Sequence, residues 1–176
     1  MESLRDATYD NHEKAEHMPF NKRMLDGKLS EEEYLMHLVQ QLEVFKAIEN
    51  IGLPSEALSR VKPTQEDVDE LRAKGCKSNT ILENSKKYVE YLKTLDKESV
   101  LPHIYLNYLA LMYGGQVMKR VVPSTGKMYD FAKKKEAMQA VRKVQKDEWA
   151  DEANKGYGFM IGILEELETY CAENLR

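Results

Sequence analysis

The feature that most constrains the fold is the segment LPHIYLNYLALMYGG, residues 101–115, which is apolar on almost every side of a helix. A helix of this kind has no polar face to present to water, so neighbouring elements must bury it. No apolar run in the chain approaches the roughly 18 residues that cross a bilayer. The segment therefore predicts a central helix, from about Ser99 to Val121, that other helices surround.

The rest of the sequence also has helical periodicity. Ser30 followed by Glu33 is a capping-box pattern that predicts the start of a long amphipathic helix, which the sequence IGLP at 51–54 ends. Ser3 with Asp6 predicts the cap of a first helix. The other expected elements are a short helix that ends at Asp26-Gly27, a loop and short helix over 55–75 capped at Thr64 and Asp67, helices over about 79–95 and 129–147, and a last helix from near Trp149.

Composition limits the classes of function. The 176 residues are 42% hydrophobic and contain no repeat or linker, so we expect a single domain over 1–176. Lys and Arg total 26 against 30 Asp and Glu, which argues against a nucleic-acid partner. The N-terminal residues are charged where a signal peptide needs an apolar region, and Cys76 and Cys171 form no CxxC motif. We expect a cytoplasmic protein with no membrane partner, present as a monomer or weak dimer.

Four histidines are the first candidates for a functional site, because a helical bundle fixes no function by itself. A ferritin-like di-iron site needs Glu-x-x-His pairs, and no histidine here has a glutamate three residues before it. His12 and His17 are five residues apart, so they do not share a helix face as the histidines of a zinc protease do. Both metal-enzyme classes are excluded.

His12 is the histidine with the most suggestive neighbours. Arg5 lies two helical turns earlier, about 10.5 Å along the same face, which suits a cation that reaches a carboxylate at the edge of a flat ligand. Glu16, one turn further on, can accept a hydrogen bond from the ring nitrogen that does not bind metal. The arrangement suits a porphyrin with propionates. The alternative is a hydrogen-bonded histidine in the core.

Gly114 and Gly115 form the second unusual feature, since each glycine within a helix costs about 1 kcal/mol relative to alanine. Two explanations remain open. The first is close helix–helix contact. The second is a flat ligand that lies directly on the backbone, or a kink that admits one.

Together these segments resemble the heme oxygenases of the bacterial, algal and animal type. Residues 4–17 (LRDATYDNHEKAEH) resemble that family's proximal helix, and residues 105–120 (YLNYLALMYGGQVMKR) resemble its distal helix. Residues 151–167 (DEANKGYGFMIGILEEL) are similar to the final helix of cyanobacterial members. The resemblance covers most of the chain. It implies an all-α, heme-oxygenase-like bundle with heme sandwiched between the first helix and a kinked central helix.

The resemblance also implies roles for individual residues. His12 would be the iron ligand, with Glu16 as its hydrogen-bond partner. Gly114 and Gly115 would lie against the heme. The residues that would contact the heme edge or its propionates are Arg5, Tyr105, Tyr157 and, on the basic helix where Gln139 replaces a usual lysine, Arg142 or Lys143.

The chain departs from the family at one important position. The family's distal helix usually reads Gly-Asp-Leu-Ser-Gly-Gly, and residues 110–115 here read ALMYGG. Leu111 therefore replaces an aspartate that holds the ordered water needed to direct oxygen toward the porphyrin. The candidates to take over this role are Tyr113, a water bound to backbone carbonyls near Ala110, and Asn107 if it points inward. The candidate catalytic positions are Leu111, Tyr113, Gly114 and Gly115.

The activity that the resemblance implies is cleavage of heme b, both cofactor and substrate, to biliverdin, iron and carbon monoxide. Oxygen and electrons from ferredoxin or a flavin reductase are required. An acidic ferredoxin would need a basic patch such as Lys133-Lys134-Lys135 with Arg142 and Lys143, although such a run is also typical of a solvated helix face. Leu111 supports an alternative, a non-catalytic heme carrier or sensor. A third option is a thiaminase-like fold or interaction module in which His12 is structural.

Overall fold

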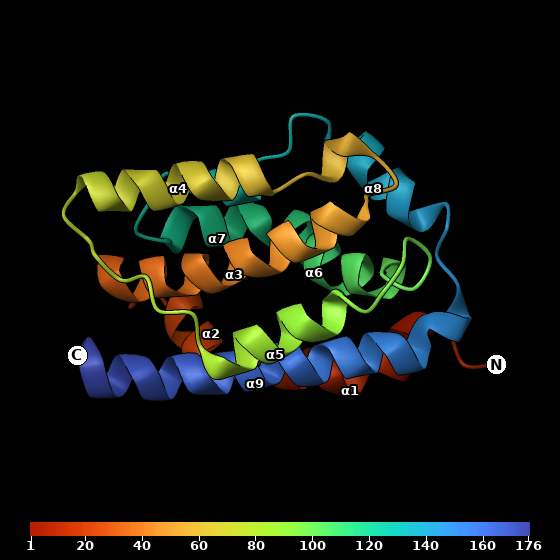
Figure 1. The fold of residues 1–176 in the computed structure, drawn as a ribbon, viewed down its shortest axis with the longest axis horizontal. Coiled ribbons are helices and arrows are strands. Elements are labelled where there is room, and N and C mark those ends of the chain that lie inside the picture. The colour runs from red at the N-terminus through yellow and green to blue at the C-terminus, as the bar shows by residue number, and fades with distance from the viewer.

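The computed structural model describes residues 1–176, and its regular elements are all helices (Figure 1). The all-α prediction is confirmed. The α-helices are α1 (Leu4–Glu16), α2 (Pro19–Leu25), α3 (Glu31–Ile51), α4 (Val61–Ala73), α5 (Glu83–Leu92), α6 (Leu101–Tyr113), α7 (Gly115–Val121), α8 (Lys134–Arg142) and α9 (Ala150–Asn174). Single-turn 3₁₀ helices cover Glu56–Leu58, Lys127–Tyr129 and Asp147–Trp149.

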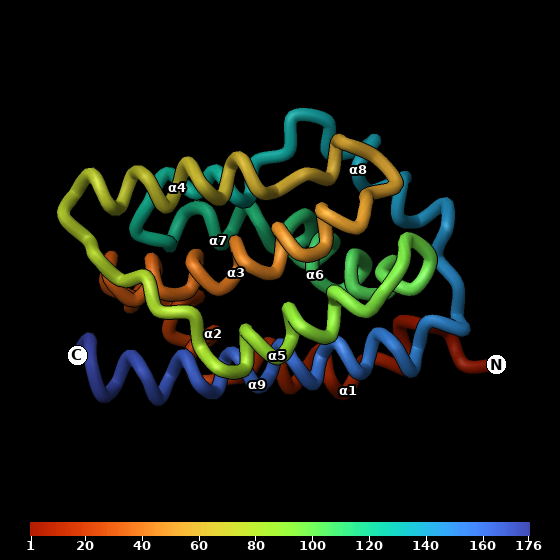
Figure 2. The backbone as a smooth tube through the Cα atoms, in the orientation of Figure 1, coloured from red at the N-terminus to blue at the C-terminus, as the bar shows by residue number.

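The long helix α9 organises one side of the molecule. It packs against α1, α5 and α6, whereas α3 packs against α4 and α5. The backbone trace places the two chain ends at opposite ends of the long axis (Figure 2). None of the helices combines the length and the apolar character that crossing a bilayer needs.

Two of the predicted helix caps are confirmed and one is wrong. Ser3 Oγ accepts from the Asp6 backbone (3.2 Å), and Ser30 and Glu33 form the complete capping box at the start of α3. Thr64 and Asp67 do not cap a helix, since both are buried inside α4. Asp67 instead accepts from the backbone nitrogens of residues 127 and 128 (3.0 and 2.8 Å). A tertiary partner overrides the local capping preference of this residue.

Two helices are shorter than predicted because their flanking residues are used elsewhere. The expected helix over 79–95 is α5, whose start is fixed by Glu166 of α9, which accepts from the Asn84 backbone (2.8 Å). The expected helix over 129–147 is only α8. Its first predicted residue, Tyr129, belongs instead to the 3₁₀ turn that Asp67 holds, and residues 130–133 precede the helix.

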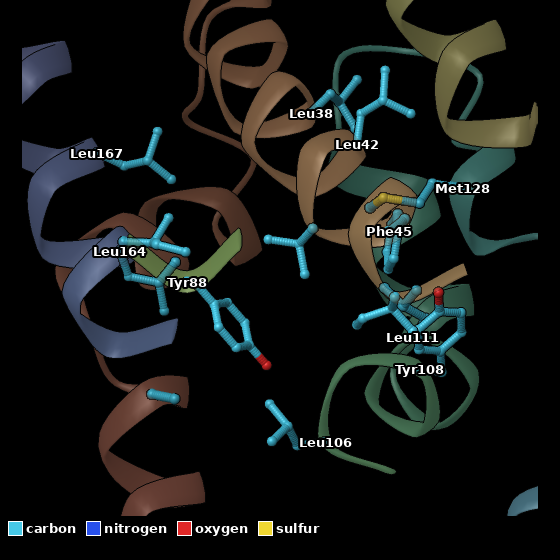
Figure 3. Packing of buried hydrophobic residues seen from close by; sticks show 14 of the residues in the cluster. Leu38, Leu42, Phe45, Tyr88, Leu106, Tyr108, Leu111, Met128, Leu164 and Leu167 are labelled. Atoms are coloured by element: carbon cyan, nitrogen blue, oxygen red, sulfur yellow. The ribbon is translucent and has the colours of Figure 1, made fainter. Parts of the chain in front are cut away.

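The predicted central helix is confirmed, with a break. Most residues of α6 are buried, and the helix ends at Tyr113. Gly114, with φ −99° and ψ 0°, separates it from α7. In Figure 3, Tyr108 and Leu111 of α6 lie together on the core side, near Phe45 of α3. The predicted kink is therefore located at Gly114.

Candidate functional site

One face of α1 presents Arg5, Tyr9, His12 and Glu16 to solvent. Their spacing of three and four residues places them in one stripe. The buried residues of the helix are Leu4, Thr8 and Ala15. The His12 side chain is 52% exposed, so the alternative of a core histidine does not hold. Tyr9 was not predicted as a site residue, although the same spacing identifies it.

Asparagines fix the direction in which this stripe points. Asn11 donates to Oδ1 of Asn154 on α9 (2.9 Å), and Asn154 donates to the carbonyl of Ala7 (3.1 Å). Because these bonds join the two helices one residue before His12, they restrict rotation of α1 about its axis. The exposed direction of His12 is thus set by the fold.

The His12 ring has two neighbours. The Glu16 Oε2 atom lies 3.4 Å from Nε2, within ion-pair distance, and its role as hydrogen-bond partner of an iron ligand stays a prediction. Tyr157 of α9 packs edge-on against the ring, with 6.5 Å between centroids and planes at 81°. The other ring nitrogen has no hydrogen-bond partner. A carboxylate on one nitrogen and a free second nitrogen is the arrangement that suits a metal-binding histidine.

The two glycines of the central segment differ in their surroundings. A Cβ atom on Gly115 would meet Tyr129 at 3.4 Å, so this glycine faces the protein. A Cβ atom on Gly114 would meet only the Ala110 carbonyl oxygen, at 3.9 Å. Neither residue has a positive φ. Apart from the helix break at this residue, no contact within the protein requires glycine at 114, which favours the ligand-contact explanation there.

Gly114 belongs to an exposed stripe on α6 and α7. Ala110, Tyr113, Gly114 and Val117 follow the spacing of one helix face, and all four are exposed. Tyr113 is 61% and Val117 53% exposed, which is unusual for large hydrophobic residues. Val117 was not predicted as a site residue, although it lies one turn after Gly114.

The predicted replacements for the missing aspartate are placed differently from one another. Leu111 is only 7% exposed and belongs to the core, whereas Tyr113 is open to solvent. Asn107, a candidate on the condition that it points inward, is bonded within the core. Its amide donates to the Tyr88 hydroxyl (3.0 Å) and to the His103 carbonyl (2.9 Å). The buried amide must be hydrogen-bonded, and its partners lie on the core side of α6.

Tyr157 lies next to predicted residues of both helices. Besides contacting His12, it has a pKa that burial and the neighbouring Tyr105 raise to about 12. Tyr105 is half-buried, with its ring edge-on to Trp149 at 6.4 Å. Tyr157 of α9 thus joins the first helix to the central one.

The basic residues of the predicted site are exposed. Arg142 donates to the Tyr113 hydroxyl and to Oε1 of Gln145 (2.7 Å). The structure therefore brings together two predicted site residues from α8 and α6. Arg5 and Lys143 are also exposed, and neither forms an ion pair.

Two hollows are prominent, and neither is lined by His12 or Gly114. One is a cavity of about 30 Å³ that includes His37, Tyr88 and Asn107 in its wall. The other is an open groove of roughly 850 Å³ beside α8, which includes Arg142 and Lys143. No group of three or more His, Cys, Asp or Glu side chains gathers to hold a metal ion. A metal on His12 would therefore need its other ligands from a bound molecule.

Comparison with known proteins decides the family. The model of the family described as heme oxygenase matches residues 1–157. This chain belongs to the heme oxygenase family. It is 28% identical to heme oxygenase 1 of Gallus gallus over 148 residues and 24% identical to heme oxygenase 1 of Bos taurus over 147 residues. Each match covers 71% of this chain but only 50% and 51% of the relative, so the chain spans about half their length.

Solved structures of heme oxygenases share the fold. Heme oxygenase-1 from the cyanobacterium Synechocystis sp. PCC6803, in complex with heme, has a TM-score of 0.78 and 21% identity, covering 97% of this chain and 92% of that one. Heme oxygenase from Leptospira interrogans has a TM-score of 0.76 and 22% identity, covering 93% and 97%. At this identity the likeness establishes the fold, and the predicted heme-oxygenase-like bundle is confirmed.

Proposed function

We propose that this chain is a heme oxygenase that binds heme b through His12 and cleaves it to biliverdin, iron and carbon monoxide with oxygen. The observation that carries the proposal is the His12 ring, half-exposed on α1, with Glu16 at one nitrogen and nothing at the other. Family membership supports the same activity. One hydrophobic core cluster of 40 residues supports the proposal that residues 1–176 work as one domain.

The residues present fit a flat, iron-containing ligand with carboxylates. When bound, heme supplies both the iron that activates oxygen and the porphyrin that is cleaved. Glu16 would orient the His12 ring and increase its basicity. Gly114 would let the α6–α7 backbone approach the ligand, because it has no side chain to hold the ligand away. Arg5 and Lys143 are unpaired cations that can bind propionates.

The distal side needs a polar group or a water to direct oxygen. We propose that the exposed Tyr113 hydroxyl and water at the Ala110 carbonyl serve this purpose, since Leu111 is buried and apolar. Arg142 already holds the Tyr113 hydroxyl and would orient it. A propionate could compete for the same guanidinium, which would link ligand binding to the position of Tyr113.

For the electron donor we propose an acidic protein, either a ferredoxin or a flavin reductase. Residues 133–135 are three exposed lysines, and Arg142 and Lys143 are exposed on the same helix region. The weak pair of Lys133 with Glu136, at 4.0 Å, leaves most of this charge uncompensated. Complementary charge of this kind increases the rate of association and makes it salt-dependent.

Leu111 is the specific observation that favours a second function, a non-catalytic heme carrier or sensor. Polarity on the distal side decides whether bound oxygen is only held or is activated. A leucine with 7% of its surface exposed supplies no hydrogen bond there. In this alternative His12 binds heme in the same way, but the porphyrin is not cleaved.

The first test of these functions is heme binding. Hemin added to the purified chain should give a Soret band, which His12→Ala should abolish or strongly shift. His17→Ala is the matched control, because His17 is also exposed, directly after this helix, and also faces a glutamate, Glu13 at 3.6 Å. A band that is equally strong and unshifted in His12→Ala overturns the assignment of His12.

The second test separates the oxygenase from the carrier. Ferredoxin, its reductase and NADPH are supplied to the hemin complex under air. Conversion of the Soret band to the broad absorption of biliverdin supports the oxygenase, and an unchanged band supports the carrier. Leu111→Asp tests the distal side: a variant no faster than the parent shows that Leu111 is not the limiting group.

A further inference from the structure

A chain of hydrogen bonds crosses the core behind the candidate site. Glu152 Oε2 lies 2.7 Å from Nε2 of His103, and Nδ1 of His103 lies 2.7 Å from the Tyr88 hydroxyl. Asn107 donates to that hydroxyl (3.0 Å), and Tyr91 donates to Glu152 (2.5 Å). The proposed function uses none of these residues.

The positions of the protons follow from these partners. Glu152 is partly exposed, and its pKa is lowered by bonds from Tyr91 and His103 that outweigh its burial, so it is an acceptor. His103 must then donate from Nε2, which leaves Nδ1 as an acceptor for the Tyr88 proton. The Tyr88 oxygen accepts from Asn107. Each hydrogen bond in this network therefore has one donor and one acceptor.

His103 is suited to take a proton. It is fully buried, and burial lowers its pKa despite the nearby Glu152, so the ring is neutral. The charged groups that face it are Glu152 and Lys155, and the other titratable neighbours are Tyr88 and Tyr91. A carboxylate on the far nitrogen stabilises the imidazolium that forms when the near nitrogen is protonated.

The surroundings of Tyr88 isolate it from solvent. Its ring is buried and stacks on Phe159 at 4.9 Å between centroids and 8° between planes. Figure 3 shows Tyr88 reaching from α5 toward Leu106 of α6. Among the 10 tyrosines, Tyr88 is the one hydrogen-bonded to an imidazole. Tyr34 is equally buried, but its hydroxyl forms no hydrogen bond to an imidazole.

The network lies one helix away from His12. A Cβ atom on Gly156 of α9 would sit 3.0 Å from Nδ1 of His103, so the imidazole rests directly on the α9 backbone. The next residue, Tyr157, contacts the His12 ring. Two adjacent residues of α9 thus connect the buried imidazole with the candidate iron ligand.

We propose that Tyr88 is a redox-active tyrosine that gives up one electron to an oxidant and, in the same step, its phenolic proton to Nδ1 of His103. The O–H bond of Tyr88 breaks and an N–H bond forms on His103. The products are a neutral tyrosyl radical, an imidazolium paired with Glu152, and an oxidant reduced by one electron. When an electron arrives and the proton returns from His103, the radical is reduced and the Tyr88 phenol is restored.

The oxidant in the working protein would be a porphyrin-based one-electron oxidant left when oxygen or peroxide reacts unproductively at the heme. This role rests on the proposed function, because it needs heme at His12. It suits a chain in which Leu111 has replaced the polar group expected to direct oxygen. The redox property of Tyr88 itself does not depend on heme and can be tested without it.

The first experiment uses the full chain without heme. Flash-generated tris(bipyridyl)ruthenium(III) oxidises the protein, and samples frozen after increasing delays are examined by electron paramagnetic resonance. We expect a long-lived tyrosyl signal that Tyr88→Phe loses and Tyr34→Phe retains. His103→Gln, which keeps the phenol but removes the base, should lose the same signal. An equal long-lived signal in Tyr88→Phe overturns the proposal.

A measurement on the unmodified chain protects the test against variants that fail to fold. With ¹⁵N-labelled histidine, the radical should show a coupling to one imidazole nitrogen and to an exchangeable proton that disappears in D₂O. A long-lived radical without these couplings overturns the assignment to Tyr88 and His103.

By reducing such an oxidant, Tyr88 would protect the bound heme from oxidative loss, and this protective role has its own experiment. The hemin complex is treated with hydrogen peroxide, and loss of the Soret band is followed. Tyr88→Phe should bleach faster than the parent, and Tyr34→Phe should not. Equal bleaching rates overturn the protective role. Failure to bind hemin would overturn the proposed function, while the ruthenium experiment would still decide on Tyr88.

Discussion

Arg23 of α2 and Glu33 of α3 form an ion pair with 2.6 Å between Nη1 and Oε2. Arg176 donates to the same oxygen from Nε at 3.0 Å, and the Glu33 side chain is 4% exposed. Burial by itself would raise the pKa of Glu33. Hydrogen bonds from Arg23, the Ser30 backbone and Arg176 outweigh burial and lower the pKa from 4.5 to about 2.

This lowered pKa predicts a loss of stability in acid. Glu33 stabilises the folded state above the pKa of an unfolded glutamate, and that contribution disappears as the pH falls from 4.5 toward about 2. The loss over the whole window is about 3 kcal/mol of unfolding free energy. Urea unfolding at several pH values measures it. Glu33→Gln should flatten this part of the profile, whereas Glu31→Gln, at a nearby glutamate whose side chain is 45% exposed, should leave it unchanged.

Gly114→Ala should weaken hemin binding without lowering the stability of the fold. A Cβ atom at 114 meets only open space and the Ala110 carbonyl, so the free energy of unfolding should change by less than about 0.5 kcal/mol. Hemin affinity should fall, because the added methyl group would hold the ligand off the backbone. Gly158→Ala, whose Cβ atom also meets nothing within 4 Å, is the control and should bind hemin normally. Unchanged affinity in Gly114→Ala would contradict the proposed heme contact.

Gly156→Ala should destabilise the fold although Gly158→Ala should not. A Cβ atom on Gly156 would lie 2.4 Å from Cδ2 of Leu106 and 3.0 Å from Nδ1 of His103, so the Leu106 side chain must move and the buried His103 ring is crowded. Overpacking of this kind costs about 1–3 kcal/mol. Gly158→Ala should instead gain up to about 1 kcal/mol from helix propensity. Thermal unfolding of both variants measures the difference, and equal melting temperatures would rule out the close contact.

Glu16→Ala should weaken heme binding through His12. Loss of the carboxylate that orients a metal-binding histidine typically costs about 10–100-fold in affinity. Hemin titration measures this change. Glu13→Ala is the matched control, since Glu13 forms the same type of pair with His17 on the same helix. If both variants bind hemin equally, Glu16 has no special role at the His12 ring.

Much of the helical framework could be predicted because its signals are local. The capping box of Ser30 and Glu33 and the apolar run at 101–115 each specify an element without reference to the rest of the chain. Thr64 and Asp67 carry an equally local signal that was wrong. The partners of Asp67 lie some sixty residues further along, where its carboxylate accepts from the Lys127 and Met128 backbone nitrogens, and no local pattern reveals this.

The residues of the candidate site also fall into those that local spacing predicts and those that it does not. Arg5, His12 and Glu16 share one helix, so their spacing alone predicted their common face, and the structure has them there. Family resemblance placed Tyr157 near the heme edge, but its contact with His12 joins distant parts of the sequence and was not predicted. The direction of Asn107 could not be read from its own helix, because the Tyr88 hydroxyl on α5 decides it.

Trp149 is the single tryptophan of the chain, and it lies edge-on to Tyr105, a predicted propionate contact. All tryptophan emission therefore originates at one known place beside the candidate site. Porphyrin binding can be followed by quenching of this emission without any label. Iron-free porphyrins, which have no bond to offer His12, can then be compared directly with hemin in the same optical assay.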